Sequence, residues 1–230
     1  MIKRRFDLKS IVGDLSENPA SPASPFLTFA QKNLSYIAAA IIVIFLSLSV
    51  FLAWKYFDGK KENQAMIAYF QAYKSYEKSI KEDRSLDQPL QLFQATAEEY
   101  QGTSAEVLSF FYIGNCQFAM KNYDSAIDSY HDFLQSVSDQ TNLVLLACDS
   151  LGYCYEEKKD FSNAIKYFKK TIVPPPGLGE DGCLNIARCY ESIGDKENSL
   201  TFYNKVIVEY PDSSNINFVR EKIRLLQSMS

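Results

Sequence analysis

The residues of this sequence whose types and spacing could do chemistry are a glycine-rich segment, one histidine and five cysteines. Residues 177–182, GLGEDG, match the GxGxxG spacing of dinucleotide-binding loops. Such a loop follows a strand and opens a helix whose N-terminus attracts phosphate. Three prolines precede it here, and Glu180 and Asp181 would repel a pyrophosphate. We therefore predict no nucleotide site and interpret the segment as a loop that leads into the following helices.

The remaining polar candidates do not form a catalytic group either. His131 is the only histidine, and no cysteine or acid stands at metal or catalytic spacing from it. The acidic pairs Glu98–Glu99 and Glu156–Glu157 are adjacent in sequence, so their side chains point in different directions on a helix. The sequence shows no nucleophile, phosphate loop or metal cluster. We predict that the protein is not an enzyme, has no catalytic residues, and binds no cofactor or metal.

The cysteines are spaced in a way that disfavours chemistry within one helix. Cys148 and Cys154 are six residues apart, as are Cys183 and Cys189, and Cys116 stands alone. Six residues of helix rise about 9 Å and turn to another face, so neither pair can bridge or chelate a metal within its helix. We predict small buried hydrophobic residues. A disulfide between neighbouring helices is the alternative.

The element that must position everything else is the apolar run from Tyr36 to Trp54. It has no charge between Lys32 and Lys55, and it has the length of about 20 residues that a membrane-spanning helix needs. Aromatic rings at both ends suit the two membrane interfaces. We predict one transmembrane helix over residues 34–55.

Two other interpretations of this run fit the sequence less well. A cleaved signal peptide would be shorter, and it would be followed by a small-x-small cleavage site, which is absent after Trp54. A buried core helix would need partner segments of equal apolarity, and the chain has none. A lipid anchor on cysteine is not expected, because the first cysteine is Cys116.

Charge is divided unevenly on the two sides of this run. Of the 24 Lys/Arg and 28 Asp/Glu residues, eight and four precede Glu62, so the part from Glu62 onward carries 16 basic and 24 acidic residues. An acidic domain is a poor ligand for nucleic acid and for anionic lipid, so we predict no nucleic-acid partner. Residues 1–33 are basic and rich in Pro and Ser, which predicts a disordered tail that stays in the cytoplasm. Lysines 55, 60 and 61 favour the opposite orientation.

From Glu62 onward the apolar residues follow helical spacing and no strand pattern occurs. The stripe Met66, Tyr69, Tyr73, Tyr76 and Ile80 predicts a first helix. A second helix follows from Ser85 or Asp87, with Pro89 in its first turn, and ends near Gly102.

Three later segments repeat one another. They begin at Phe110 (FFYIGNCQFAMKNYDSAIDSYHDF), Cys148 (CDSLGYCYEEKKDFSNAIKYFKKT) and Cys183 (CLNIARCYESIGDKENSLTFYNKV). A small residue recurs at separations of 38 and 35, the period of a helix–turn–helix solenoid. Its three copies, each followed by an aromatic in the second helix, are the pairs Gly114 with Tyr130, Gly152 with Phe168 and Ala187 with Tyr203.

These segments resemble the tetratricopeptide repeat (TPR). The resemblance implies an all-α fold in which each small residue lets two helices approach closely. With the membrane helix in front, we predict a TPR-like α-solenoid of about four helix pairs plus a capping helix. The expected boundaries are a divergent pair at 62–104, repeats at 105–139, 140–176 and 180–211, and a cap at 213–229, whose charges at Arg220, Glu221, Lys222 and Arg224 keep it soluble.

The resemblance also implies a concave wall that binds extended peptides or partner helices. Its predicted residues are Leu108, Phe111, Asn115, Phe118, Leu146, Asp149, Tyr153, Glu156, Leu184, Arg188 and Glu191. This wall is aromatic and acidic, and it lacks the lysines with which some TPR proteins clamp a C-terminal carboxylate.

The order of tail, span and repeats is similar to that of the ancillary subunit of the bacterial Sec translocon. That resemblance implies a single-pass protein of the bacterial inner membrane with a periplasmic repeat domain. Its expected partners are translocon subunits, chaperones or exported chains. A second hypothesis places the same scaffold in the cytoplasm, as an adaptor of a secretion or division complex, which free cysteines would suit. A third, an enzyme accessory that positions a substrate, has no catalytic group to support it.

Overall fold

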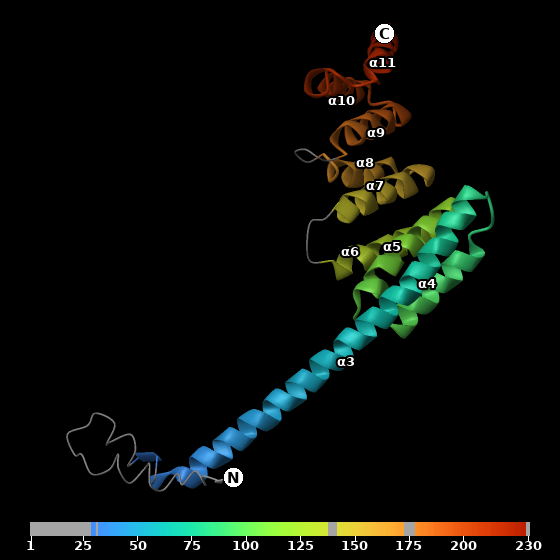
Figure 1. The fold of residues 1–230 in the computed structure, drawn as a ribbon. Coiled ribbons are helices and arrows are strands. Elements are labelled where there is room, and N and C mark those ends of the chain that lie inside the picture. The colour runs from blue at the N-terminus through green and yellow to red at the C-terminus, as the bar shows by residue number, and fades with distance from the viewer. Residues whose placement is uncertain (1–28, 31, 138–141, 173–177, 229–230) are drawn as a thin grey trace. The chain divides into compact units, whose positions relative to one another are not determined.

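The computed structural model describes residues 29–30, 32–137, 142–172 and 178–228. The described residues contain α-helices and no strand (Figure 1). The helices are α3 (Leu34–Lys81), α4 (Asp87–Glu99), α5 (Ser104–Ala119), α6 (Tyr123–Ser136), α7 (Asn142–Glu157), α8 (Phe161–Lys169), α9 (Gly179–Ser192), α10 (Lys196–Glu209) and α11 (Ile216–Ser228). The chain divides into two compact units, residues 1–59 and 60–230. The predicted disordered tail, residues 1–33, lies almost wholly outside the described residues.

Within the first unit, the apolar run forms the first part of α3. This helix is long and apolar enough to cross a membrane, and its most apolar 18-residue window has a mean hydropathy of 2.7 with none of it buried. The same length and composition are found in signal sequences. Ser47 and Ser49 donate hydrogen bonds from their hydroxyls to the carbonyls of Ile44 and Phe45, so both polar groups are satisfied within the helix. The exposure of the run removes the alternative of a buried core helix.

In the second unit, the last turns of α3 pack with α4 to form the first helix pair. The core contact is a group of aromatic rings: Tyr69 lies 5.9 Å from Phe93, and Tyr76 lies 5.4 Å from Tyr112 of α5, measured between ring centroids. Helix α4 begins at Asp87, where the Ser85 hydroxyl accepts a hydrogen bond from the Asp87 amide. The chain leaves this pair through Gly102, whose φ of +78° suits glycine. Residues 62–99 thus form two packed helices, at the place where a divergent pair was predicted.

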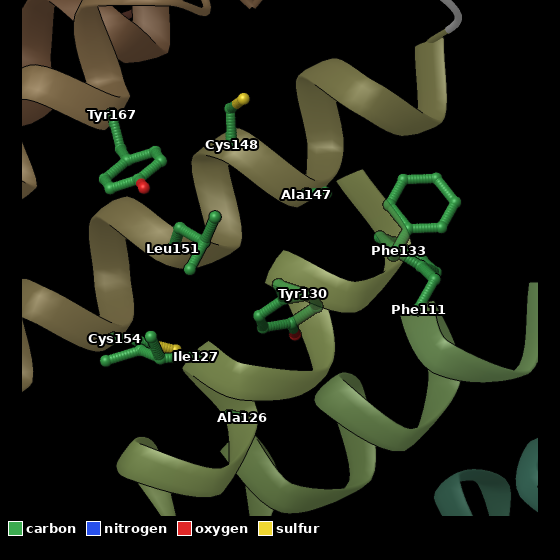
Figure 2. Packing of buried hydrophobic residues seen from close by; sticks show 10 residues of the cluster. All are labelled: Phe111, Ala126, Ile127, Tyr130, Phe133, Ala147, Cys148, Leu151, Cys154 and Tyr167. Atoms are coloured by element: carbon green, nitrogen blue, oxygen red, sulfur yellow. The ribbon is translucent and has the colours of Figure 1, made fainter. Parts of the chain in front are cut away.

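Three further pairs, α5–α6, α7–α8 and α9–α10, follow, and each helix contacts the next along the chain. One buried cluster illustrates how the pairs share a core, because it joins residues of α5, α6, α7 and α8 (Figure 2). A second cluster joins α8 to α9, and a third joins α9, α10 and α11. Each apolar face is thus covered by the next pair, as expected for a solenoid.

The repeated small residue acts as the sequence pattern predicts. A Cβ built on Gly114 would lie 2.7 Å from Cε1 of Tyr130, and one on Gly152 would lie 2.8 Å from Cζ of Phe168. Both distances are well inside ordinary van der Waals contact, so the paired helices approach more closely than alanine allows.

The turns between paired helices also repeat. Lys121, Lys159 and Gly194 occupy equivalent positions and all have positive φ values, of +63°, +61° and +78°. Asp160 and Asp195, which directly follow Lys159 and Gly194, cap helices α8 and α10. The side chain of each accepts a hydrogen bond from the backbone amide three residues later. The two lysines adopt a left-handed backbone that is unfavourable for side chains other than glycine or asparagine. We infer that the packing of each pair outweighs that local cost.

Candidate partner-binding face

The predicted wall residues lie on the first helix of each repeat. Four are on α5, four on α7 and three on α9. Their surroundings differ. Phe111 is only 6% exposed and packs 5.5 Å from Phe133, so it belongs to the core and is not available to a partner. Leu108 and Leu184 are half-buried against apolar clusters of the neighbouring helices. Leu146 is 41% exposed.

On α5 the two remaining wall residues are held by neighbouring side chains. Asn115 accepts a hydrogen bond of 2.7 Å from the Tyr130 hydroxyl to its Oδ1. Phe118 packs edge-on against Tyr123 at 5.6 Å between centroids. Both side chains are half-buried and extend the α5 face without a charge.

The structure brings the other five wall residues together across α7 and α9. Glu156 of α7 and Arg188 of α9 form a two-pronged ion pair, in which Nε and Nη2 of the guanidinium each lie 2.7 Å from a carboxylate oxygen. The Arg188 guanidinium also lies 5.9 Å from the centre of the Tyr153 ring. This geometry fixes the guanidinium in place, because two parallel bonds define its orientation.

The same pattern continues from α9 to α11. Lys222 donates a hydrogen bond of 2.8 Å from its Nζ to Glu191 Oε2. Burial is the larger cause of the raised pKa of the Tyr203 phenol, and the Glu191 carboxylate raises it further. Lys222, which was expected to keep the capping helix soluble, also links the cap to the last repeat.

Asn185 is a member of this face that the sequence analysis missed. Its side chain is 3% exposed, and its Nδ2 donates to Tyr153 Oη at 2.9 Å and to Asp149 Oδ1 at 3.5 Å. A polar residue at an apolar-spaced position of a first helix was the signal that could have identified it. Asn185 thus connects α9 to the two wall residues of α7.

Asp149 is the acid of this face with the most altered titration. Burial raises its pKa to about 6, and the nearby Asp181 adds to the rise. The bond from Asn185 and the charge of Arg188 act in the opposite direction. Among the described residues Asp149 has no ion pair within 4.0 Å. Glu156 and Glu191 of the predicted acidic wall are therefore paired with cations, and Asp149 takes up a proton more readily than an exposed aspartate.

His131 and the five cysteines have no exposed side chain. His131 is half-buried, and its Nε2 lies 3.3 Å from the Tyr167 hydroxyl. The five cysteines are buried free thiols, and burial raises the pKa of Cys116, Cys154 and Cys189 to about 12. No group of three or more metal-ligating side chains is found within the described residues.

The glycine-rich segment differs from its predicted form. Gly177 lies outside the described residues, but α9 begins at Gly179, so residues 179–182 form a helical turn and not a loop. Glu180 accepts hydrogen bonds from Ser213 and Asn215, so its carboxylate holds the start of the capping segment.

One tetratricopeptide repeat model matches residues 108–139 and 184–213, and a second matches residues 146–172. The three pairs match tetratricopeptide repeat models. The matched segments correspond to α5–α6, α9–α10 and α7–α8 and leave the α3–α4 pair unmatched. No curated protein matches the chain.

Solved structures with a similar fold include three of MamA. The one titled "Crystal structure of MamA" has a TM-score of 0.54 at 16% identity and covers 66% of this chain and 81% of its own. "Crystal structure of MamA protein" gives 0.56 at 15%, covering 74% and 82%. "MamA RS-1 ArsTM double mutant" gives 0.54 at 10%, covering 70% and 89%. At these identities the likeness shows the TPR-like solenoid fold.

Proposed function

We propose that this protein is a TPR scaffold held at a membrane by the first part of α3, with the face of α5, α7 and α9 binding a segment of a partner protein. The TPR stack supports protein–protein interaction, because such repeats present a continuous surface that no single helix pair could form. The observation that carries the membrane anchor is the fully exposed apolar window of α3, directly before the repeats. A helix with that many exposed apolar side chains would be poorly soluble in water, whereas lipid solvates them.

The function we favour within this class is assistance to newly exported proteins at the bacterial inner membrane. In this proposal the repeats lie in the periplasm and contact translocon subunits, chaperones or exported chains. The order of basic tail, apolar run and repeats supports it, as does a face that offers aromatic rings and hydrogen-bonding groups to an extended chain. Tyr153 and Leu146 are the groups of this face that a passing chain would meet most directly, since both retain exposed surface.

A cytoplasm-facing adaptor of a secretion or division complex is the second candidate. The five buried free thiols favour it, because a reducing compartment keeps cysteines unpaired. The lysines at positions 55, 60 and 61 also favour it, because positive residues beside a span are typically cytoplasmic. The two candidates differ in the side of the membrane on which the repeats lie.

The first test is therefore the topology of the full chain. A reporter that is active only outside the cytoplasm and one that fluoresces only inside are each fused after Ser230. We expect activity of the outside reporter. Signal from the inside reporter alone would refute the periplasmic proposal and transfer the scaffold to the cytoplasmic adaptor.

The second test asks what the face touches. A photo-crosslinking residue replaces Leu146 on the wall, and the matched control replaces Asp132, which is exposed on α6. We expect Leu146 to give adducts with the translocon channel subunit or with a radiolabelled exported chain, and Asp132 to give none. Equal labelling from both positions would show that the face is not the binding surface.

A further inference from the structure

A groove separate from the wall runs along α8 toward the turn that follows α9. Its volume is about 630 Å³, enough for several side chains of a bound peptide. Phe161 and Ile165 of α8 line one part, and Tyr190 and Ile193 at the end of α9 line the other. Ile165 is buried, Phe161 and Tyr190 are half-buried, and Ile193 is 52% exposed. The apolar residues are thus recessed, with a single one standing at the edge.

Three lysines border the groove, namely Lys159, Lys166 and Lys169. None of them forms an ion pair with another described residue. The one acid beside them, Asp160, is engaged elsewhere, since its carboxylate accepts hydrogen bonds from the backbone and side-chain nitrogens of Asn163 at 3.1 and 2.7 Å. The lysines therefore present positive charge that the protein itself does not neutralise.

The position of this charge in the chain is unusual. Residues 158–170 contain five lysines and one acid, although the part of the chain from Glu62 onward carries 24 acids against 16 basic residues. A second hollow, on α3, also has three lysines at its border, but Glu77 and Glu82 lie among them, whereas the groove along α8 has only Asp160. Charge complementarity therefore points to an acidic ligand.

We propose that this groove binds an acidic segment of a partner protein, with apolar side chains of the segment in the groove and its Asp or Glu residues at the three lysines. This is a second interaction surface beyond the wall, and it does not depend on which partner the wall binds. An anionic lipid surface is the less suitable occupant, because a flat bilayer cannot reach recessed side chains and would be repelled by the acidic remainder of the domain.

The test uses the full chain in neutral detergent and a fluorescein-labelled 16-residue peptide, EELL repeated four times, followed by fluorescence anisotropy. The control peptides are KKLL and EESS repeats of the same length, which remove the negative charge and the apolar side chains respectively. We expect EELL to bind, EESS to bind at least about tenfold more weakly, KKLL not to bind, and the EELL affinity to fall as salt rises from 50 to 500 mM.

The decisive variants separate local from general charge. Lys166→Glu/Lys169→Glu should weaken EELL binding by about tenfold or more, and Ile193→Ser by a few-fold, with unchanged helicity. The matched control, Lys78→Glu/Lys81→Glu, makes the same change in net charge at the hollow on α3, where Glu77 and Glu82 already offset the lysines, and should leave binding unaltered. Equal loss in both double variants, or no binding of EELL to the unaltered chain, would overturn the proposal. Lysine-dependent binding of short-chain phosphatidylglycerol without binding of EELL would overturn it in favour of lipid.

Discussion

Substitution of Gly114 by alanine tests directly whether close helix approach sets the geometry of the repeats. The added Cβ would lie 2.7, 2.8 and 2.9 Å from three carbons of the Tyr130 ring. The ring would have to retreat by roughly 0.7 Å to reach an ordinary contact. It is 1% exposed, packs 6.0 Å from Phe111 and is tethered through its hydroxyl to Asn115, so it has little room to move.

Two opposing effects decide the sign. Overpacking of this kind costs about 1–3 kcal/mol, whereas alanine in place of glycine within a helix stabilises by about 1 kcal/mol. We therefore expect Gly114→Ala to lower the free energy of unfolding by about 1 kcal/mol. In a Tyr130→Leu background the ring is absent, so the same substitution should raise the stability by about 1 kcal/mol relative to Tyr130→Leu alone.

The assay is urea denaturation of the full chain in neutral detergent, followed by far-ultraviolet circular dichroism for both single variants and the double variant. The double-mutant cycle isolates the interaction between the two positions and cancels the cavity left by Tyr130→Leu. A stabilising Gly114→Ala in the original background, or the same effect in both backgrounds, would refute the argument that the ring fixes the helix separation.

Three further predictions follow from buried titratable groups and from the ion pair of the wall. The five thiols should resist a maleimide reagent in the native chain and react with it in urea. Burial raises the cysteine pKa values, to about 11–12 for four of the five, so the urea midpoint should fall as pH rises above about 8.5, the pKa of a thiol in the unfolded chain. A urea midpoint that stays constant up to about pH 10.5 would contradict this. Asp149→Asn should stabilise the chain by about 2–3 kcal/mol at pH 7.5 and have no effect at pH 3. A carboxyl whose folded pKa of about 6 exceeds its unfolded value of about 3.9 loses stability as pH rises between the two, by about 1.36 kcal/mol per pKa unit. Equal effects at both pH values in urea melts would exclude that cause. Arg188→Ala should lower the free energy of unfolding by about 1 kcal/mol, as expected for a half-exposed ion pair, and most of this loss should disappear in a Glu156→Gln background. An undiminished loss in that background would show that other contacts hold Arg188.

The repeat pairs could be predicted from sequence because their packing depends on a few periodic residues. Gly114 and Gly152, with an aromatic 16 residues later in each case, specify a close crossing, and the structure places each ring against its glycine. The left-handed turns could not be predicted in the same way. Lysine at positions 121 and 159 gives no local signal for positive φ, and only the alignment with Gly194 shows that the turn is common to all three pairs.

The resemblance to the tetratricopeptide repeat placed Glu156, Arg188 and Glu191 on the first helix of their repeats, where the structure has them. It could not predict which of these side chains form ion pairs, because that depends on the spacing between neighbouring repeats. Lys222 shows the limit most clearly, because a charge on a terminal helix is typical of a soluble cap, yet here it reaches back to Glu191. Phe111 shows the converse, since it is part of the core, whereas Asp149 and Leu184 at the equivalent positions of the next two repeats are half-buried.

The ion pairs along the wall determine what kind of partner each surface can select. Glu156–Arg188 and Glu191–Lys222 tie α7 to α9 and α9 to α11, so a basic ligand at the wall would have to displace cations already in place. That exchange gains little free energy, because one partly exposed ion pair replaces another. Selection at the wall should then depend on shape, on Tyr153 and on hydrogen bonds, and should vary little with salt. The groove along α8 has the opposite character, since its lysines are unneutralised by described residues, and its ligand should be lost as salt rises. Binding measured at two ionic strengths would therefore assign a partner to one surface or the other before any residue is changed.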